Sequence, residues 1–342
     1  MRVTQQDIAK IAQVSQATVS RVLAGDEKVE PTLRERVAQV IKKHNYKPDV
    51  RARSLRNRKT GLIGLVINRP PGGLAEDPFY AKLVAELIDY LSDTPFHLCL
   101  DMASSDVGQQ AIYDEMLRSR RVDGLILVES EARDERIGQL QADRFPFVLI
   151  GNPLTSDQIV SVDNDNVLAG EMATSHLINA GFRRVGMLAG RRGITVSEDR
   201  ITGYQRAVRG RQDEHLIWHA GFGANSAREV AMKILSQPDR PDALVVLDDY
   251  MAMGVVSAAR ECGLRIPKCL GIVAFNDSNI CALVEGGLTS VSLNISAIVR
   301  AACDQLMDIV ESRELRHQRR VIVPCELRVR GSSKLDLEAN RP

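Results

Sequence analysis

Apolar positions at the start of the chain recur with the spacing of an α-helix. A single helix over residues 4–23 would have to continue through residues 13–15, so we predict two short helices with a turn between them. A third helix is predicted from Pro31 to about His44, because proline is favoured at the first helical position, and Asn45 ends it because asparagine tolerates the left-handed conformation. The apolar side chains expected to close this three-helix head are Ile8, Val19, Val22, Leu33, Val37, Val40 and Ile41.

The first two helices begin at residues suited to capping. Thr4 can cap the first helix, with Asp7 completing an approximate capping box, and Ser15 can cap the second by accepting from the backbone N–H of Ala17 or Thr18. This is a helix-turn-helix, although an αα-hairpin in a globular core has the same spacing. In a helix-turn-helix the second helix enters the DNA major groove by its N-terminal end. The residues expected to contact DNA are Thr4, Ser15, Gln16, Ala17, Thr18, Ser20 and Arg21.

Positive charge is concentrated in the first 60 residues. They hold 14 lysines and arginines against 6 aspartates and glutamates, a net charge of +8, whereas the whole chain carries +1 and the remaining 282 residues therefore −7. A basic head on an acidic body is expected when one end of a protein meets a polyanion. The alternative is a helical head that is merely well solvated.

The segment after the head predicts a second contact with DNA. Pro48 blocks continuation of the third helix, and Asp49 can cap a new helix of about two turns, which is marginal in water without a partner. The arginines of this segment can contact DNA phosphates, and one large apolar residue, Leu55, lies among them. The alternative is that the segment is only a solvated linker. The residues expected to contact DNA here are Arg51, Arg53, Ser54, Leu55 and Arg56.

From Gly61 the pattern changes to alternating strands and helices. Strand-like apolar runs occur at Leu62–Ile67, Val122–Val128, Phe147–Ile150, Val185–Ala189, Ala243–Leu247 and Gly271–Phe275. Amphipathic helices are predicted at Tyr80–Leu91, Val167–Ala180, Arg200–Val208, Ser226–Leu235 and Tyr250–Cys262. Short apolar strands between helices indicate parallel βαβ units. We therefore predict an all-α head with a hinge helix, followed by two doubly wound α/β lobes whose ligand binds in a cleft between them.

Other classes of protein are disfavoured. No apolar run approaches a membrane span and no signal-peptide segment is evident, so we expect a cytoplasmic protein; six cysteines without CxxC spacing indicate reduced thiols. The phosphate-loop, nucleophile-elbow and H-E-x-x-H motifs are missing, and Gly221-Phe222-Gly223 lacks the third glycine of the dinucleotide fingerprint. The histidines His215 and His219 are four residues apart, but none of the residues between them is acidic, as a metal-binding motif of this spacing would need. We expect no enzyme, no cofactor and no metal site.

Several motifs in this order are similar to those of the LacI/GalR family of bacterial transcriptional repressors. They are IAKIAQVSQATVSRVL, Pro31–Val37, Tyr46-x-Pro48, Ala52–Leu55 and Ile63–Val66. The resemblance extends from end to end of the chain. It implies that the segment from Asp49 to Arg56 is a hinge helix that orders on operator DNA, with Leu55 wedged into the minor groove, a known device for bending DNA.

The same resemblance implies a body like type I periplasmic sugar-binding proteins, whose chain crosses between lobes three times. The crossings are expected near residues 163–165, 288–294 and 320–324. The implied domains are a head at 1–48, a hinge and linker at 49–60, an N-terminal lobe at 61–163 plus 292–322, and a C-terminal lobe at 164–291 plus 323–342.

Effector residues follow from the family's motifs. The segment Asp77-Pro78-Phe79-Tyr80 resembles the family's N-P-F-F motif, and Arg200 is the first residue of an R-x-x-G motif. In the N-D-x-M-A-x-G motif Asp248 replaces the asparagine, and in the F-D-D motif Asn276 replaces the first aspartate. Planar polar groups and aromatic faces suit a sugar, although the aromatic residues have core positions as their alternative. The implied effector-binding residues are Phe79, Tyr80, Arg200, Phe222, Asp248 and Asn276.

We therefore expect a DNA-binding transcriptional regulator, a repressor of carbohydrate-utilisation genes. It would act as a homodimer on a pseudo-palindromic operator and respond to a sugar or sugar derivative. The alternatives are a regulator that needs a purine or phosphoprotein co-repressor, and a sugar-binding protein without DNA binding. The tail after Ser333 contains no leucine heptad, so no coiled-coil tetramer is expected.

Overall fold

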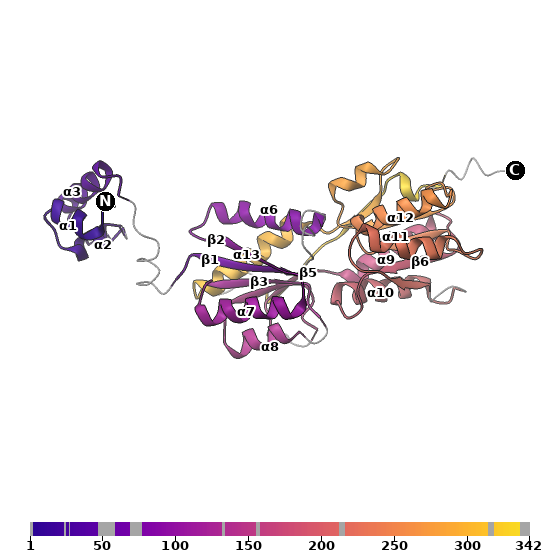
Figure 1. The fold of residues 1–342 in the computed structure, drawn as a ribbon, viewed down its shortest axis with the longest axis horizontal. Coiled ribbons are helices and arrows are strands. Elements are labelled where there is room, and N and C mark those ends of the chain that lie inside the picture. The colour runs from indigo at the N-terminus through magenta and orange to yellow at the C-terminus, as the bar shows by residue number, and fades with distance from the viewer. Residues whose placement is uncertain are drawn as a thin grey trace. The chain divides into compact units, whose positions relative to one another are not determined.

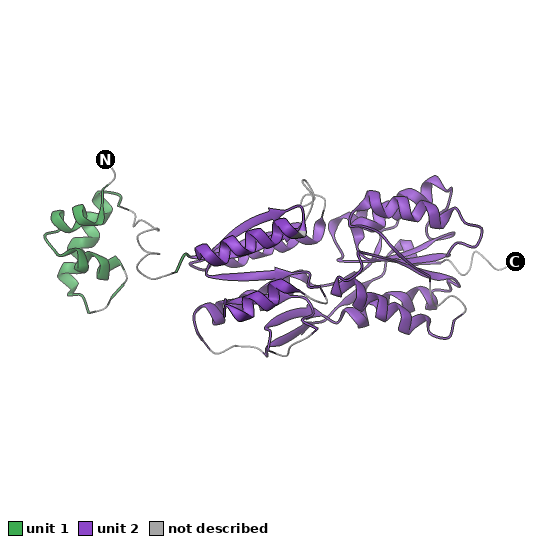
Figure 2. Ribbon diagram, turned by 60° about the horizontal axis from the view of Figure 1, so that its bottom comes forward, with its two compact units in different colours: residues 1–60 green, residues 61–342 purple. Residues whose placement is uncertain are grey.

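The chain divides into two compact units, Met1–Thr60 and Gly61–Pro342 (Figure 2). The structure, a computed structural model, describes residues 3–23, 25–26, 28–46, 59–68, 77–131, 134–154, 158–211, 216–313 and 318–335. The predicted hinge helix, with Arg51, Arg53, Ser54, Leu55 and Arg56, lies outside these ranges. None of the helices in the described ranges combines the length and the apolar character needed to span a membrane.

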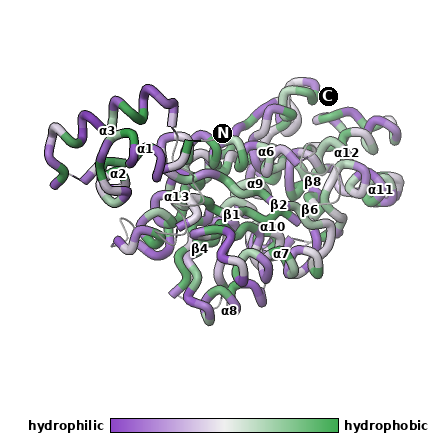
Figure 3. Tube along the Cα trace, turned by 60° about the vertical axis from the view of Figure 1, so that its left-hand side comes forward, coloured by the Kyte–Doolittle hydropathy of each residue, from purple (hydrophilic) through white to green (hydrophobic). Residues whose placement is uncertain are grey.

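The first unit contains the three predicted helices, α1 (Gln5–Ile11), α2 (Gln16–Leu23) and α3 (Pro31–Lys43). Hydrophobic and hydrophilic residues alternate along α3 (Figure 3). The apolar positions of the three helices meet in one core, because Ile8, Val19 and Val37 are each fully buried there. Val22, Val40 and Ile41 pack against this core, whereas Leu33 is half-buried and lies outside it.

Two six-stranded sheets form the second unit, and each is covered by helices on both faces (Figure 1). The first sheet is parallel throughout, in the order β11-β5-β4-β3-β1-β2. Its strands are β1 (Leu62–Asn68), β2 (His97–Ala103), β3 (Gly124–Val128), β4 (Phe147–Ile150), β5 (Ser161–Asn164) and β11 (Arg320–Val323). Its helices are α6 (Pro78–Ser92), α7 (Asp106–Ser119), α8 (Glu135–Ala142) and α13 (Ile295–Val310).

The second sheet has the order β12-β10-β9-β8-β6-β7, and its edge strand β12 alone pairs antiparallel. Its strands are β6 (Val185–Ala189), β7 (Ile217–His219), β8 (Ala243–Val246), β9 (Gly271–Phe275), β10 (Thr289–Ser292) and β12 (Glu326–Arg328). Its helices are α9 (Asn166–Asn179), α10 (Thr195–Val208), α11 (Ala224–Leu235) and α12 (Asp249–Glu261), with 3-10 turns at Asn279–Leu283 and Gly331–Ser333. The predicted α/β architecture of two parallel-sheet lobes is confirmed.

The structure also contains elements that the sequence analysis does not predict. All six predicted strands are present, and the bounds of β4, β6 and β9 agree with the apolar runs. The additional strands are β2, β5, β7, β10, β11 and β12, and the additional helices are α7, α8 and α13. Most of these strands lie at sheet edges or between the lobes, where polar residues interrupt the apolar pattern.

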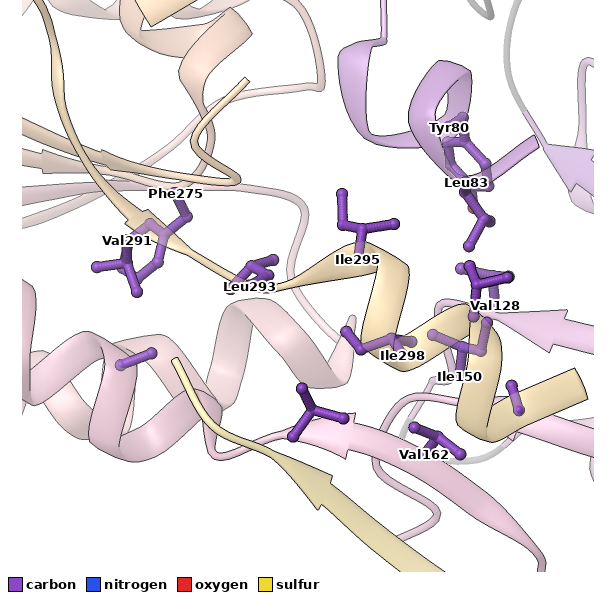
Figure 4. Close-up of a cluster of buried hydrophobic side chains, with 14 of the residues drawn as sticks. Tyr80, Leu83, Val128, Ile150, Val162, Phe275, Val291, Leu293, Ile295 and Ile298 are labelled. Carbon is purple, nitrogen blue, oxygen red and sulfur yellow. The ribbon is translucent and has the colours of Figure 1, made fainter. Parts of the chain in front are cut away.

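The chain crosses between the two sheets three times. It leaves the first sheet after β5, returns to it after β10, and passes from β11 to β12. Asn164 ties the three crossings together, because its Nδ2 donates to the carbonyl oxygens of Leu293, at 3.0 Å, and Val323, at 2.8 Å. The apolar core is continuous past the crossings, with Leu293 lying between the labelled side chains of the two lobes (Figure 4).

Candidate functional site

The helix-turn-helix is held by the predicted caps. The Thr4 backbone N–H donates to Asp7 Oδ2 at 2.9 Å, and the Asp7 N–H donates to Thr4 Oγ1 at 3.3 Å, so the capping box is present. Ser15 Oγ accepts from the Thr18 N–H at 3.1 Å. Gln13, in the turn, adopts the left-handed conformation with φ of 51°. These local bonds fix where α2 begins.

Helix α2 presents a polar face to its surroundings. Gln16, Ala17 and Arg21 are exposed, whereas Val19 is fully buried against the other two helices. Ser20 is half-buried. The burial of one face leaves the N-terminal end of α2 accessible, which is the geometry that a major-groove helix needs. The roles of the individual side chains in DNA reading stay predictions.

A cavity lies between the two lobes of the second unit. It encloses about 720 Å³ of space between protein atoms, part of it open to solvent. Its apolar wall includes Val128, Ile150, Leu293 and Ile298, all visible in Figure 4. The carboxyl ends of the parallel strands meet here, as the doubly wound fold requires.

Five of the six predicted effector residues line this one cavity. They are Phe79, Arg200, Phe222, Asp248 and Asn276. Tyr80 is not among the lining residues, because it is only 2% exposed and points into the core with Leu83 of the same helix (Figure 4). Its ring meets Phe79 edge-on, with ring centres 5.4 Å apart. Phe79 thus faces the cavity while Tyr80 packs behind it.

Arg200 is buried at the base of the cavity and is 3% exposed. Its Nη1 donates to the carbonyl oxygen of Leu247 at 2.7 Å, its Nε donates to Asn166 Oδ1 at 3.1 Å, and its guanidinium lies 4.2 Å from the ring centre of Phe275. Burial lowers the pKa of Arg200 to about 10, so the group stays charged at neutral pH. The packing fixes a planar cation whose position does not depend on a ligand.

The glycines of the two helical motifs explain how this geometry is reached. A Cβ atom on Gly203 would lie 2.0 Å from the carbonyl oxygen of Val167, so only glycine lets α10 approach α9 this closely. A Cβ atom on Gly254 would likewise lie 2.0 Å from the carbonyl oxygen of Ala224, so glycine also allows the close approach of α12 to α11. The close helix pairs set the positions of Arg200 and Asp248 at the helix ends that face the cavity.

Asp248 and Asp249 have different roles. Asp248 lines the cavity and caps α12, accepting from the Met251 N–H at 2.7 Å. Burial raises the pKa of Asp248 to about 7, and the carboxylate of Asp77 across the cavity adds to this shift. Asp249 is fully buried and accepts from Ser278 and from the hydroxyl of Ser290, so it joins the start of α12 to the loop after β9 and to strand β10.

Three further cavity residues, Asp163, Asn164 and Asn166, come from the first crossing and were not predicted as binding residues. Asp163 is 9% exposed and accepts from the Asn164 N–H at 2.8 Å and from Asn166 Nδ2 at 2.9 Å. Burial raises the pKa of Asp163 to about 7, with a smaller contribution from Asp199. The available signal was the polar run of residues 163–166, in which residues 163–165 were predicted only as a crossing between the lobes.

Polar contacts join the two lobes along one side of the cavity. Ser130 Oγ and Thr195 Oγ1 are 2.9 Å apart, and the Thr195 N–H donates to the Ser130 carbonyl oxygen at 3.0 Å. Asn152 Nδ2 donates to Asp199 Oδ2 at 3.0 Å. Across the described ranges, no group of three or more His, Cys, Asp or Glu residues is arranged to hold a metal ion.

Comparison with known proteins identifies the family. Residues 4–49 match the model of bacterial regulatory proteins of the lacI family, and residues 174–333 match a periplasmic binding protein-like domain. The chain is 30% identical to the HTH-type transcriptional regulator CelR of Thermobifida fusca, over 97% of this chain and 98% of that protein. The chain belongs to the lacI family. It is therefore a DNA-binding transcriptional regulator.

Solved structures of lacI-family regulators share this fold. A complex of the regulator CelR with cellobiose is 28% identical, with a TM-score of 0.74 over 97% of this chain and 100% of that one. The lac repressor dimer bound to operator and the anti-inducer ONPF has a TM-score of 0.84 at 23% identity, over 98% and 100% of the two chains, and the likeness is one of fold. In this lacI-family chain the residues predicted to contact DNA belong to the first unit, Met1–Thr60, and the cavity belongs to the second, Gly61–Pro342.

Proposed function

We propose that this lacI-family protein represses a carbohydrate-utilisation operon and leaves its operator when a sugar or sugar derivative occupies the interlobe cavity. One observation carries the proposal: Arg200, Asp248 and Asn276 meet beside Phe79 and Phe222 in a single cavity. Planar polar groups that bond paired hydroxyls, next to aromatic faces, are the chemistry that recognises a sugar. The cellobiose complex of the related CelR supports this choice of ligand class.

The lobes supply a two-state element for the response. A ligand that contacts both walls favours the closed arrangement, in which Thr195 meets Ser130 and Asp199 meets Asn152. Such coupling between two sites is typically about 1–3 kcal/mol, or about 5- to 150-fold in affinity. Closure would rotate the lobes, separate the paired hinge segments of a homodimer, and so release the operator.

In this proposal α2 reads the operator. Gln16 can pair bidentately with adenine, the methyl group of Ala17 can meet that of thymine, and Arg21 can contact guanine or phosphate. Each good bidentate pair contributes about 1–3 kcal/mol of discrimination. Replacing Gln16 with Ala is expected to relax preference at one base pair per half-site without changing the salt dependence, which phosphate contacts govern. Selection of binding sites from randomised DNA measures this.

The hinge segment, outside the described residues, would bend the operator. If Leu55 wedges into the central base step, Leu55→Ala removes the bend and weakens specific binding by about tenfold or more, while nonspecific binding changes little. Gel mobility of circularly permuted operator fragments measures the bend. Full bending by the variant would reduce Leu55 to a linker residue.

The decisive experiment begins with the full-length protein and a panel of sugars in a thermal-shift assay. Each sugar that raises the melting temperature is then added to a gel-shift assay with the selected operator. Release of DNA supports the proposal. Tighter DNA binding, or a response to purines alone, would indicate a co-repressor instead, and failure to select any DNA site would contradict the operator-binding role.

A further inference from the structure

Negative charge dominates the wall of the cavity. Within the described part of the chain, Asp77, Glu129, Asp163 and Asp248 line it, against the single guanidinium of Arg200. Asp77 and Asp248 come from opposite lobes, and the charge of Asp77 acts on Asp248. A ligand that enters must therefore lie among carboxyl groups from both sides.

Two of the helix N-termini at the cavity do not compensate for this charge. The first amides of a helix are a common anion site, but at α6 and α12 the protein's own carboxylates occupy them. Asp77 Oδ1 accepts from the Phe79 and Tyr80 N–H groups at 3.1 and 3.3 Å, and Asp248 caps α12 in the same way. At α10, the Thr195 N–H is bonded to Ser130. An incoming anion finds these amide donors already used.

The polar groups left over are mostly acceptors. Among the described residues, the second carboxylate oxygens of Asp163 and Asp248 accept no hydrogen bond, nor does the amide side chain of Asn276 make one. Nη2 of Arg200 is likewise a donor without a hydrogen bond in the described structure. Asp163 and Arg200 are more than nine-tenths buried, and what remains accessible of these groups faces the cavity, where a ligand can form hydrogen bonds with them.

We propose that the cavity selects its effector by charge: it binds an unphosphorylated sugar, excludes the phosphate ester of that sugar, and uses Asp248 to enforce the exclusion. Sugar hydroxyls can donate to Asp163 and Asp248 and accept from Arg200. A phosphate carries about −1.5 to −2 charges at pH 7 and chiefly acceptor oxygens. Above the pKa of about 7 that Asp163 and Asp248 have, it would face like charges without enough donors. The inference rests on the proposed function, since it assumes a sugar in this cavity.

Matched pairs of ligands test the inference on the full-length protein. Titration calorimetry would compare D-glucose, D-fructose, D-mannose and trehalose each with its 6-phosphate. For the sugar that binds, we expect the 6-phosphate to bind on the order of 100-fold more weakly, because like charges across an interface are strongly unfavourable. Asp248→Asn is expected to reduce this ratio by about tenfold, mainly by improving phosphate binding, since discrimination is a difference of two affinities.

A matched control separates charge at the cavity from helix capping. Asparagine keeps the capping oxygen of Asp248, so α12 is preserved. Asp165 caps α9 through the Leu168 N–H at 2.8 Å but is not among the cavity-lining residues, so Asp165→Asn should leave the ratio unchanged.

Equal or tighter binding of a phosphate ester would overturn the inference and leave the sugar-responsive function standing. An unchanged ratio in Asp248→Asn would overturn the role of Asp248. If no sugar of either form binds, the proposed function fails and the inference with it.

Discussion

The two lobes contribute different chemistry to the cavity between them. The first lobe supplies apolar surface, from Phe79, Val128 and Ile150, and its polar groups are mostly carboxyls, those of Asp77, Glu129 and Asp163. The second lobe supplies most of the hydrogen-bond donors, from Asn166, Thr195, Arg200 and Asn276, together with Asp248. Hydrogen bonds are directional and apolar burial is not. The difference implies that the second lobe orients the ligand, while the first lobe closes over it and adds contact area.

The largest effect is expected at Arg200, the polar anchor of the second lobe. Arg200→Met should weaken effector binding by about 100-fold or more, since loss of a charged hydrogen-bonding partner that leaves buried groups unpaired costs about 2–5 kcal/mol. It also leaves the carbonyl oxygen of Leu247 without its donor. Calorimetry with the identified sugar measures this. Arg206→Met, at an exposed position of the same helix, is the control and should bind normally.

A second test concerns the cost of holding Asp248 in the cavity. Its pKa is about 7 in the folded protein against 3.8 for the free group, so the native state binds more protons between these values. The free energy of unfolding should therefore fall as the pH rises from 4 to 7. Asp248→Asn removes this contribution and should stabilise the protein by about 1–3 kcal/mol at pH 8, less than the full shift because Asp248 borders a cavity.

Denaturant unfolding across this pH range measures the effect. The difference between Asp248→Asn and the wild type should shrink toward zero below pH 3.8, where both states hold the proton. The groups that act on Asp248 are Asp77 from the opposite lobe, and Asp249 and Arg200 from its own. A stability difference that does not vary with pH would contradict the raised pKa.

The apolar wall of the first lobe should contribute less. Phe79→Ala is expected to weaken effector binding by about 2- to 12-fold, because an aromatic contact is worth about 0.5–1.5 kcal/mol beyond its buried area. Ile88→Ala is the matched control, since Ile88 lies on the same helix α6 but is 56% exposed. A loss larger than that of Arg200→Met would reverse the proposed division of roles between the lobes.

The smallest effect is expected where the lobes touch. Thr195→Val removes the hydroxyl that meets Ser130 Oγ but keeps the shape of the side chain and the backbone bond. A net hydrogen bond is worth about 0.5–1.5 kcal/mol, and this one joins the lobes without touching the effector, so effector affinity should fall by only about 2- to 3-fold. Thr202→Val, which removes a hydroxyl bonded within the same helix, should leave affinity unchanged. Equal losses in both variants would assign the effect to α10 itself.

Residues of the cavity show how far prediction could go. The family resemblance could name Phe79, Arg200, Phe222, Asp248 and Asn276, all of which line the cavity. The burial of Tyr80 was also readable, because Tyr80, Leu83, Leu87 and Leu91 follow a helical period and all are buried. Helix α13 was likewise signalled, by an asparagine cap followed by apolar residues at helical spacing.

Strand β5 was not predictable from its own residues. Ser161, Asp163 and Asn164 are polar yet buried, which a pattern of apolar runs does not indicate. Asn164 is stable there because distant groups satisfy its side chain: the carbonyl oxygens of Leu293 and Val323 accept from its Nδ2. The strand exists only when all three crossings are in place.

The sequence by itself determined the head and the apolar strands of the lobes. The Thr4–Asp7 capping box, the Ser15 cap and the left-handed Asn45 each depend on residues within a few positions of one another. Only the tertiary structure decided the cavity, its excess of carboxylates and the raised pKa of Asp248. These properties depend on burial and on charges brought together from opposite lobes, and no local pattern in a chain encodes the distance between segments so far apart.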